Sequence, residues 1–272
     1  MSTRPDGDAA VGGLCAEDAT IGYDTRVVSR ALSVTIPAGS FTAIIGPNAC
    51  GKSTLLRALA RVILPAAGRI VLDGRTITDY PPREAARRLG LLPQTALAPD
   101  GITVADLVAR GRYPHQTLFQ HWRADDEAAV TRALAATGVE ELAGRPVDEL
   151  SGGQRQRVWV AMLLAQDTPI LLLDEPTTFL DIAHQYELLE LFRRFHEEGR
   201  TLVTVLHDLN QACRYADHLI VMKDGVVVGV GAPEDVMSVE LVREVFGLHA
   251  LVVPDPATGT PMVVPVDPRS AS

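Results

Sequence analysis

The stretch that decides the fold is Gly46-Pro47-Asn48-Ala49-Cys50-Gly51-Lys52-Ser53-Thr54, which matches the phosphate-loop pattern of glycine, four residues and Gly-Lys-Ser. In such a loop, backbone N–H groups and the N-terminus of the next helix point at one anion. We expect Lys52 to meet the β- and γ-phosphates and the Ser53 hydroxyl to ligate Mg²⁺. A buried strand pattern at 41–45 precedes the loop and a helical pattern from 52 to 61 follows it. The stretch therefore predicts a nucleoside-triphosphate site.

A second element, Asp174-Glu175, follows the apolar run Ile170–Leu173. A buried strand that ends in a carboxylate places Asp174 where it can hold the Mg²⁺ shell. Glu175 points to the other side, so we expect it to act as the general base for the attacking water. Alone, two acidic residues could simply cap a strand, but beside a phosphate loop they indicate hydrolysis.

A third element, Leu150-Ser151-Gly152-Gly153-Gln154, precedes a helical pattern that carries Val158, Met162 and Leu163. A serine and two glycines before a helix predict a second anion-binding helix N-terminus. One nucleoside triphosphate does not need two such ends from the same chain. The element therefore indicates a site shared with a second copy, although in isolation it could be an ordinary capped turn.

Strand and helix patterns alternate along the chain and predict an α/β fold. Apolar runs at 32–36 and 41–45, separated by a turn at Pro37-Ala38-Gly39, predict an antiparallel start. Strand patterns at 69–72, 170–173 and 201–206 and helical patterns at 182–196 and after Asp208 predict a mostly parallel sheet covered on both faces. The helical segment 103–138 predicts an α-helical subdomain inserted into a P-loop NTPase core.

Length and composition fit one α/β domain with an insertion, because the chain has 272 residues of which 47% are apolar. The longest apolar run, Val158–Ala165, has eight residues against the ~18 of a membrane-spanning helix, and we expect no secretory signal. The net charge of −9 gives free nucleic acid no bulk attraction. Cys15, Cys50 and Cys213 lack metal-like spacing, so we expect three plain thiols in a reducing compartment.

In order and over nearly the whole chain, these motifs resemble the nucleotide-binding subunit of the ABC transporter family. The phosphate loop resembles Walker A, Ile170–Glu175 Walker B, and Leu150–Gln154 the signature motif. Four shorter matches are Tyr23 at the position of the adenine-stacking aromatic, Gln94 in the Q-loop, Leu180-Asp181 in the D-loop and His207 as the switch histidine. Ala49 departs from the family, where glycine is usual at this position. Its Cβ disfavours a positive φ, which glycine adopts freely.

The resemblance implies that two copies close head to tail. Ser151 and Gly153 of one copy would meet the γ-phosphate held by Lys52 of the other, so Ser151–Gln154 and Asp181 form one half of each site. Gln94 would sense Mg²⁺ and the water, and His207 would hold Glu175 and the water in line. The remaining histidines are expected to be core or surface residues: His115, His121, His184, His196, His218 and His249.

The expected domains are a discontinuous ATP-binding core at 13–95 and 156–255, a helical subdomain at 96–155 that ends in the signature motif, and a C-terminal tail at 256–272. Residues 1–12 lack periodicity and are expected to be disordered. The implied partners are a second copy, transmembrane permease subunits and, indirectly, an extracytoplasmic substrate-binding protein, with no nucleic acid. The implied location is the cytoplasmic face of the bacterial cell membrane, as a peripheral subunit.

Three segments resemble the ATPases of ferric-siderophore importers in particular: Gly111–Gln116, Thr177–Gln185 and Pro254–Pro261. Importers of haem and vitamin B12 share part of this pattern and remain alternatives. An alternative from another class is a soluble ABC ATPase that acts on DNA or the ribosome, but this chain has no heptads, Cys pairs or second phosphate loop. A regulatory module that no longer hydrolyses ATP is disfavoured because Glu175, Gln94 and His207 are intact.

Overall fold

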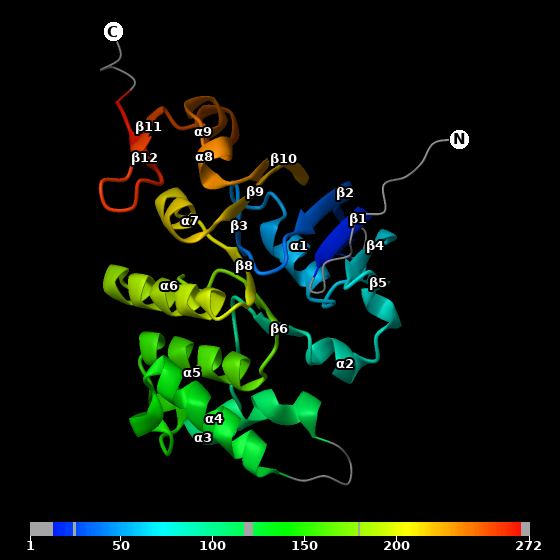
Figure 1. The fold of residues 1–272 in the computed structure, drawn as a ribbon, viewed down its shortest axis with the longest axis vertical. Coiled ribbons are helices and arrows are strands. Elements are labelled where there is room, and N and C mark those ends of the chain that lie inside the picture. Colours follow the sequence, from blue (N-terminus) through cyan, green and yellow to red (C-terminus); the bar gives the residue numbers. More distant parts are fainter. Residues whose placement is uncertain (1–12, 24–25, 117–121, 179, 268–272) are drawn as a thin grey trace.

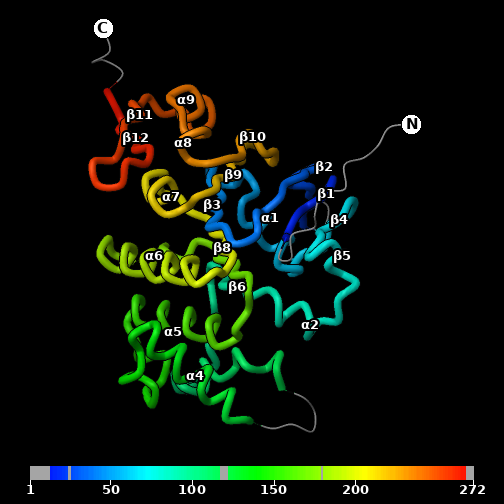
Figure 2. The backbone as a smooth tube through the Cα atoms, in the orientation of Figure 1, coloured from blue at the N-terminus to red at the C-terminus, as the bar shows by residue number. Residues whose placement is uncertain are grey.

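The computed structural model of the protein describes residues 13–23, 26–116, 122–178 and 180–267. Residues 1–12, for which the sequence predicts disorder, and His121 lie outside these ranges. The molecule is elongated, with the helices of residues 104–165 at one end, the large sheet in the middle and residues 233–265 at the other end (Figure 1). The backbone trace in Figure 2 leaves the central sheet for the helical end and returns to it before residue 170.

The central sheet has six strands in the order β10-β9-β3-β8-β7-β6. The pairs from β9 to β6 are parallel, whereas β10 joins β9 antiparallel at the edge. This arrangement confirms the predicted mostly parallel sheet, and it brings the carboxyl ends of β3, β6, β7 and β8 to one edge. The six strands are β3 (Phe41–Ile45), β6 (Leu89–Leu92), β7 (Ile170–Leu173), β8 (Thr201–Val205), β9 (His218–Lys223) and β10 (Val226–Gly231).

A separate antiparallel sheet at the N-terminal side has the order β2-β1-β4-β5. It confirms an antiparallel β part, but the expected pairing of the runs at 32–36 and 41–45 is wrong. The first run belongs to β2, which pairs with β1, while the second is β3 of the central sheet. The predicted turn at Pro37–Gly39 is present, and it connects β2 of the antiparallel sheet to β3 of the central sheet. The four strands are β1 (Leu14–Tyr23), β2 (Arg26–Ile36), β4 (Ala67–Leu72) and β5 (Arg75–Thr76).

Side chains of the central strands alternate between two buried cores, as the period of a strand requires. In β7, Ile170 and Leu172 belong to the core that contains Leu55 and Leu56 of α1 (Lys52–Leu59). Leu171 and Leu173 belong to the opposite core, which contains Phe192 of α6 (Ile182–Glu197). A strand buried on both faces explains why this run is apolar throughout.

Three helices of the middle segment, α3 (Val104–Ala109), α4 (Ala124–Thr137) and α5 (Gly152–Ala165), pack together at one end of the molecule (Figure 1). Buried Arg112, in the segment after α3, bonds to the other two helices: its Nε donates to Asp126 Oδ1 at 2.8 Å and its Nη1 to the Ala165 carbonyl at 2.8 Å. Since α5 runs across residues 155 and 156, we propose that the helical subdomain extends to Ala165. Short 3₁₀ helices connect these parts: η2 (Arg110–His115), η3 (Glu140–Leu142) and η4 (Val147–Glu149).

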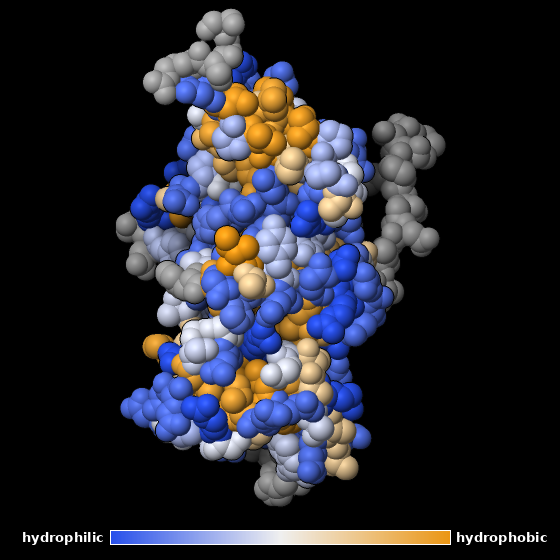
Figure 3. Space-filling model, turned by 90° about the vertical axis from the view of Figure 1, so that its left-hand side faces the viewer, coloured by the Kyte–Doolittle hydropathy of each residue, from blue (hydrophilic) through white to orange (hydrophobic). Residues whose placement is uncertain are grey.

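Residues after β10 form two short helices, α8 (Pro233–Val236) and α9 (Val239–Phe246), and a hairpin of β11 (Ala250–Pro254) and β12 (Pro261–Pro265). The hairpin crosses the proposed boundary at 255, so residues 256–265 are part of a folded element. Val263 is 4% exposed and joins the core, whereas Leu251 and Val264 face outward at 54% and 36% exposure. Apolar surface gathers at this upper end of the molecule (Figure 3).

The remaining elements connect or cover the two sheets. They are η1 (Ile77–Asp79), α2 (Pro82–Ala86) and α7 (Leu209–Tyr215). Among the described residues, no helix combines the length and the apolar character needed to cross a membrane.

Candidate functional site

The phosphate loop leaves the carboxyl end of β3 and enters α1 at Lys52. Lys52 is 5% exposed, and its Nζ donates hydrogen bonds to the carbonyls of Gly46 (2.8 Å) and Pro47 (2.9 Å). Gly46 has a φ of 152°, and a Cβ there would lie 2.2 Å from the Met222 carbonyl oxygen, so only glycine fits. The loop is thus held by its own lysine and by the neighbouring strand β9.

Ala49 occupies the left-handed region, with a φ of 61°. The sequence comparison with the family predicts glycine here, because the Cβ of alanine disfavours a positive φ. The structure shows that Ala49 nevertheless adopts a positive φ. An L-residue with a Cβ in this region costs roughly 1–2 kcal/mol relative to the right-handed region. Backbone strain of this kind is concentrated at functional segments.

Glu175 is held from two sides by side chains that the sequence analysis named. Gln94 Nε2 donates to Glu175 Oε2 at 2.6 Å, and His207 Nε2 lies 2.9 Å from Glu175 Oε1. Thr178 Oγ1 adds a hydrogen bond to Oε2 at 3.3 Å, a contact that the sequence analysis did not foresee. The Glu175 backbone also lies in the left-handed region, at φ 53°. Residues from the ends of three parallel strands therefore meet at one carboxylate.

Asp174 is completely buried and forms an ion pair with Arg57, whose Nη2 lies 3.2 Å from Asp174 Oδ2. Within the described part of the chain, neither Asp174 oxygen accepts a hydrogen bond. A buried carboxylate with unused acceptor capacity fits a hard cation that prefers oxygen ligands, as Mg²⁺ does. Arg57 also donates to the Tyr23 hydroxyl at 3.2 Å, so it joins the acidic pair to the expected adenine platform. Arg57 belongs to no motif and was not predicted from the sequence.

A pocket of about 240 Å³ brings together several of the expected nucleotide-binding residues. Tyr23 lies on its wall and is 42% exposed, and the phosphate loop, Glu175 and His207 lie on the others. Arg26 and Val28 of β2 complete the wall beside Tyr23 and were not predicted. The full lining is Tyr23, Arg26, Val28, Asn48, Ala49, Gly51, Lys52, Ser53, Thr54, Glu175 and His207.

The signature element does not line this pocket. Ser151 caps α5, with its Oγ accepting from the Gln154 N–H at 3.3 Å while its own N–H donates to Gln154 Oε1 at 3.1 Å. Ser151 and Gly152 are exposed. The serine-glycine turn is therefore both a cap and an open helix N-terminus.

Asp181 caps the neighbouring helix, α6, and also lies outside the pocket. Its Oδ1 accepts from the His184 N–H at 2.9 Å and lies 2.6 Å from His184 Nδ1. The backbone hydrogen bond from His184 is the main cause that lowers the pKa of Asp181. A Cβ at Gly153 would lie 3.5 Å from the His184 ring, so the N-termini of α5 and α6 are neighbours. The sequence analysis predicted that His184 is an ordinary core or surface residue, and its contacts with Asp181 and Gly153 were not foreseen.

The three cysteines are free thiols, as expected. Burial raises the pKa of Cys15, of Cys50 in the phosphate loop and of Cys213, which reaches about 12. These thiols are therefore protonated at neutral pH and have little nucleophilic character.

Comparison with known families decides what this arrangement is. The family model of the ABC transporter matches residues 29–178, which include the phosphate loop, Gln94, the signature element and Glu175. The chain belongs to the ABC transporter family. Its P-loop NTPase fold binds nucleotide.

Curated relatives of this ABC protein match it over nearly their whole length. The ferric enterobactin transport ATP-binding protein FepC of Escherichia coli is 57% identical over 94% of this chain and 95% of its own. The probable siderophore transport system ATP-binding protein YusV of Bacillus subtilis is 51% identical over 93% of this chain and 92% of its own. Among solved structures, a dimeric bacterial ABC transporter cassette superposes with a TM-score of 0.71, at 27% identity over 80% of this chain and 98% of that one.

The strain at Ala49 leads to a prediction about stability. Ala49→Gly relieves the left-handed strain, which stabilises the folded state. It also raises the conformational entropy of the unfolded chain, which lowers the free energy of unfolding by roughly 0.4–1 kcal/mol, so we expect a net increase in the free energy of unfolding of about 0.5 kcal/mol. Urea unfolding of the purified protein measures it. Ala38→Gly is the matched control, because Ala38 has no positive φ and should lose stability. A loss of stability in Ala49→Gly as large as in the control would contradict the strain argument.

Proposed function

We propose that this protein is the ATP-hydrolysing subunit of a bacterial importer of ferric siderophores. Two copies act as a pair on transmembrane permease subunits, at the cytoplasmic face of the cell membrane. The observation that carries the ATPase function is the placement of Glu175, held by Gln94 and His207 beside the phosphate loop. The siderophore substrate is supported by the two relatives named for siderophore transport.

In this proposal, Tyr23 stacks on the adenine while the loop N–H groups and Lys52 hold the phosphates. Bound Mg²⁺ would be held by Ser53 and Asp174, with Gln94 close by, and would neutralise charge on the phosphate oxygens. Lys52 already lies at the N-terminus of α1, so little reorganisation is needed for it to turn from loop carbonyls to phosphates.

Glu175 takes the proton of the water that attacks the γ-phosphorus. Both of its oxygens have partners: Gln94 and Thr178 at Oε2 and His207 at Oε1. The attacking water can still bind at Oε1, because a carboxylate oxygen has two lone pairs and His207 uses one of them. His207 keeps Glu175 in line, and Gln94 has its other expected role at Mg²⁺.

The second copy completes the site in this proposal. Among the described residues, the pocket is lined by one helix N-terminus, that of α1, and the exposed N-terminus of α5 at Ser151 could provide a second set of anion donors. A head-to-tail pair would place Ser151–Gln154 and Asp181 of one copy at the nucleotide of the other. An extracytoplasmic substrate-binding protein would act only through the permease, and no nucleic acid takes part, in keeping with the net charge of −9.

Glu175→Gln tests the base. The amide keeps the size and the contacts of the side chain but cannot accept the proton, so turnover should fall by at least about 100-fold while ATP binding is kept and an ATP-bound dimer accumulates. Phosphate release, nucleotide binding and size-exclusion chromatography measure the three effects. Phosphate release at the wild-type rate would remove Glu175 from the base role.

Ser151→Arg tests the shared site. The bulky cation should lower turnover at least about tenfold by blocking the pairing of two copies, without weakening ATP binding to isolated monomers. Ser238→Arg replaces the matching cap residue of α9, far from the motif, and should keep turnover. If ATP affinity of the Ser151→Arg monomer collapsed, the signature element would act in its own chain and the paired-site model would be wrong.

The transported substrate is tested in proteoliposomes that contain the protein with the permease and binding protein of its operon. A ferric siderophore should stimulate ATP hydrolysis several-fold, and haem or vitamin B12 should not. Stimulation by haem or vitamin B12 alone would overturn the siderophore assignment and leave the ATPase assignment intact. Failure of every substrate to stimulate a hydrolysing complex would overturn the importer role.

A further inference from the structure

Helix α7 begins just after His207 and has only seven residues. Isolated helices need about 12–15 residues to be stable, so α7 depends on its surroundings. Its N-terminus is capped by Asp208, whose Oδ1 accepts from the N–H groups of Asn210 (2.8 Å) and Gln211 (2.9 Å). The helix that follows the switch histidine is thus held by other parts of the chain.

The C-terminal hairpin holds α7 on one side. Asn210 Nδ2 donates to the Val263 carbonyl at 3.2 Å, and the Val263 N–H donates to Asn210 Oδ1 at 2.7 Å. One side chain therefore satisfies both backbone groups of a residue in β12, as a neighbouring strand would. Val263 is 4% exposed, which makes both hydrogen bonds hard for water to replace.

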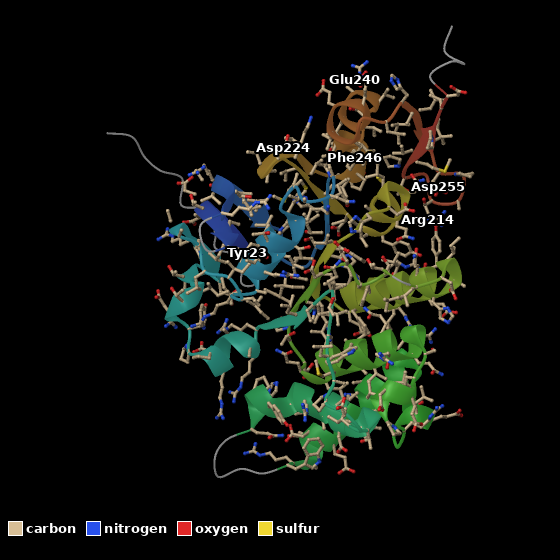
Figure 4. The ribbon with its side chains drawn as sticks, turned by 180° about the vertical axis from the view of Figure 1, so that it is seen from behind. Tyr23, Arg214, Asp224, Glu240, Phe246 and Asp255 are labelled. Carbon is tan, nitrogen blue, oxygen red and sulfur yellow. The ribbon has the colours of Figure 1, made fainter. Side chains whose placement is uncertain are left out.

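A second contact joins the same two elements at the hairpin loop. Arg214 Nη2 lies 2.7 Å from Asp255 Oδ2, and the two side chains face each other in Figure 4. Asp255 Oδ1 also accepts from the N–H groups of Ala257 (2.8 Å) and Thr258 (3.3 Å), so the ion pair and the shape of the loop depend on one carboxylate.

On its other side, α7 contacts α6. Gln211 Nε2 donates to Gln185 Oε1 at 2.8 Å, and Gln185 Nε2 donates to the Leu180 carbonyl at 3.0 Å. Tyr215 donates to Glu190 Oε1 at 2.9 Å. Helix α7 is therefore bonded both to the hairpin and to α6, a helix that packs one face into the core.

His207 lies between two anchors. On the N-terminal side, the Leu206 N–H donates to the Ile44 carbonyl of β3 at 3.3 Å, and this hydrogen bond attaches the residue before His207 to the central sheet. On the other side, the chain continues through Asp208, the cap residue of α7, into this helix. The His207 side chain is 44% exposed, so packing does little to orient the ring that reaches Glu175 at 2.9 Å.

We propose that the C-terminal hairpin β11–β12 positions His207 by fixing α7, with Asn210 as the positioning residue of this connection. The proposal rests on the role of His207 given under the proposed function. It assigns a task to the Pro254–Pro261 segment, which the sequence analysis singled out only by resemblance. The hairpin acts at a distance, since its own residues do not line the nucleotide pocket.

The test is a double-mutant cycle between Asn210→Ala and His207→Ala in the full-length protein, with phosphate release, KM for ATP and thermal unfolding as readouts. Asn210→Ala removes both hydrogen bonds to Val263 but keeps the backbone N–H that Asp208 caps. Since small misplacements of catalytic groups reduce rates strongly, kcat should fall roughly tenfold with KM within about twofold of wild type. In the His207→Ala background the same change should leave kcat unaltered, while the unfolding midpoint falls equally in both backgrounds.

Thr258→Ala is the matched control, because its hydroxyl lies in the same hairpin but contacts Thr260 rather than α7. It should keep the wild-type kcat. Wild-type kcat in Asn210→Ala, or an equal loss of kcat with and without His207, would overturn the proposal. If His207→Ala alone left turnover unchanged, the proposed role of His207 would fail instead.

Asp255→Asn keeps the cycle informative if Asn210→Ala does not fold. The amide oxygen can still accept from Ala257 and Thr258, but the charge that pairs with Arg214 is lost. We expect a kcat roughly two- to threefold lower, again only when His207 is present. The same loss in the His207→Ala background would assign the hairpin a purely structural role.

Discussion

The rest of the structure depends on one constraint, the parallel alignment of β3, β6, β7 and β8 in a sheet buried on both faces. Parallel strands end at the same edge, so the segments that follow them meet in space although they are far apart in the chain. The phosphate loop follows β3, Gln94 follows β6, Glu175 follows β7 and His207 follows β8. The alternation of apolar side chains between two cores fixes this register, because a slip by one residue would exchange the faces.

Burial differs between the side chains that meet at this edge. Lys52 and Asp174 are almost fully buried, whereas the side chain of His207 is partly exposed. Binding groups therefore gain their positions from the core, but the histidine gains its position from α7 and from what packs on α7. This division explains why residues near the C-terminus can matter for chemistry at a loop more than 150 positions earlier in the chain.

Much of the site could be predicted because short motifs carry their chemistry with them. The loop from Gly46 to Thr54, the acidic pair after β7 and the cap at Ser151 each have a local physical meaning that needs no partner. Arg26, Arg57 and His184 gave no such signal, because an arginine or histidine on a helix or strand is usually a surface residue. The pairing of the runs at 32–36 and 41–45 was mistaken since a turn fixes where a chain reverses, not which strand becomes its neighbour.

The sequence by itself determined the fold class, and it predicted the nucleotide site and the sharing of that site with a second copy, because these follow from local patterns and their order. Only the tertiary structure decided which side chains meet at Glu175, that Arg57 joins Asp174 to Tyr23, and that the C-terminal hairpin holds the helix after His207. The physical reason is that such contacts join residues far apart in the chain. Their geometry is set by how buried elements pack, and no local pattern records it.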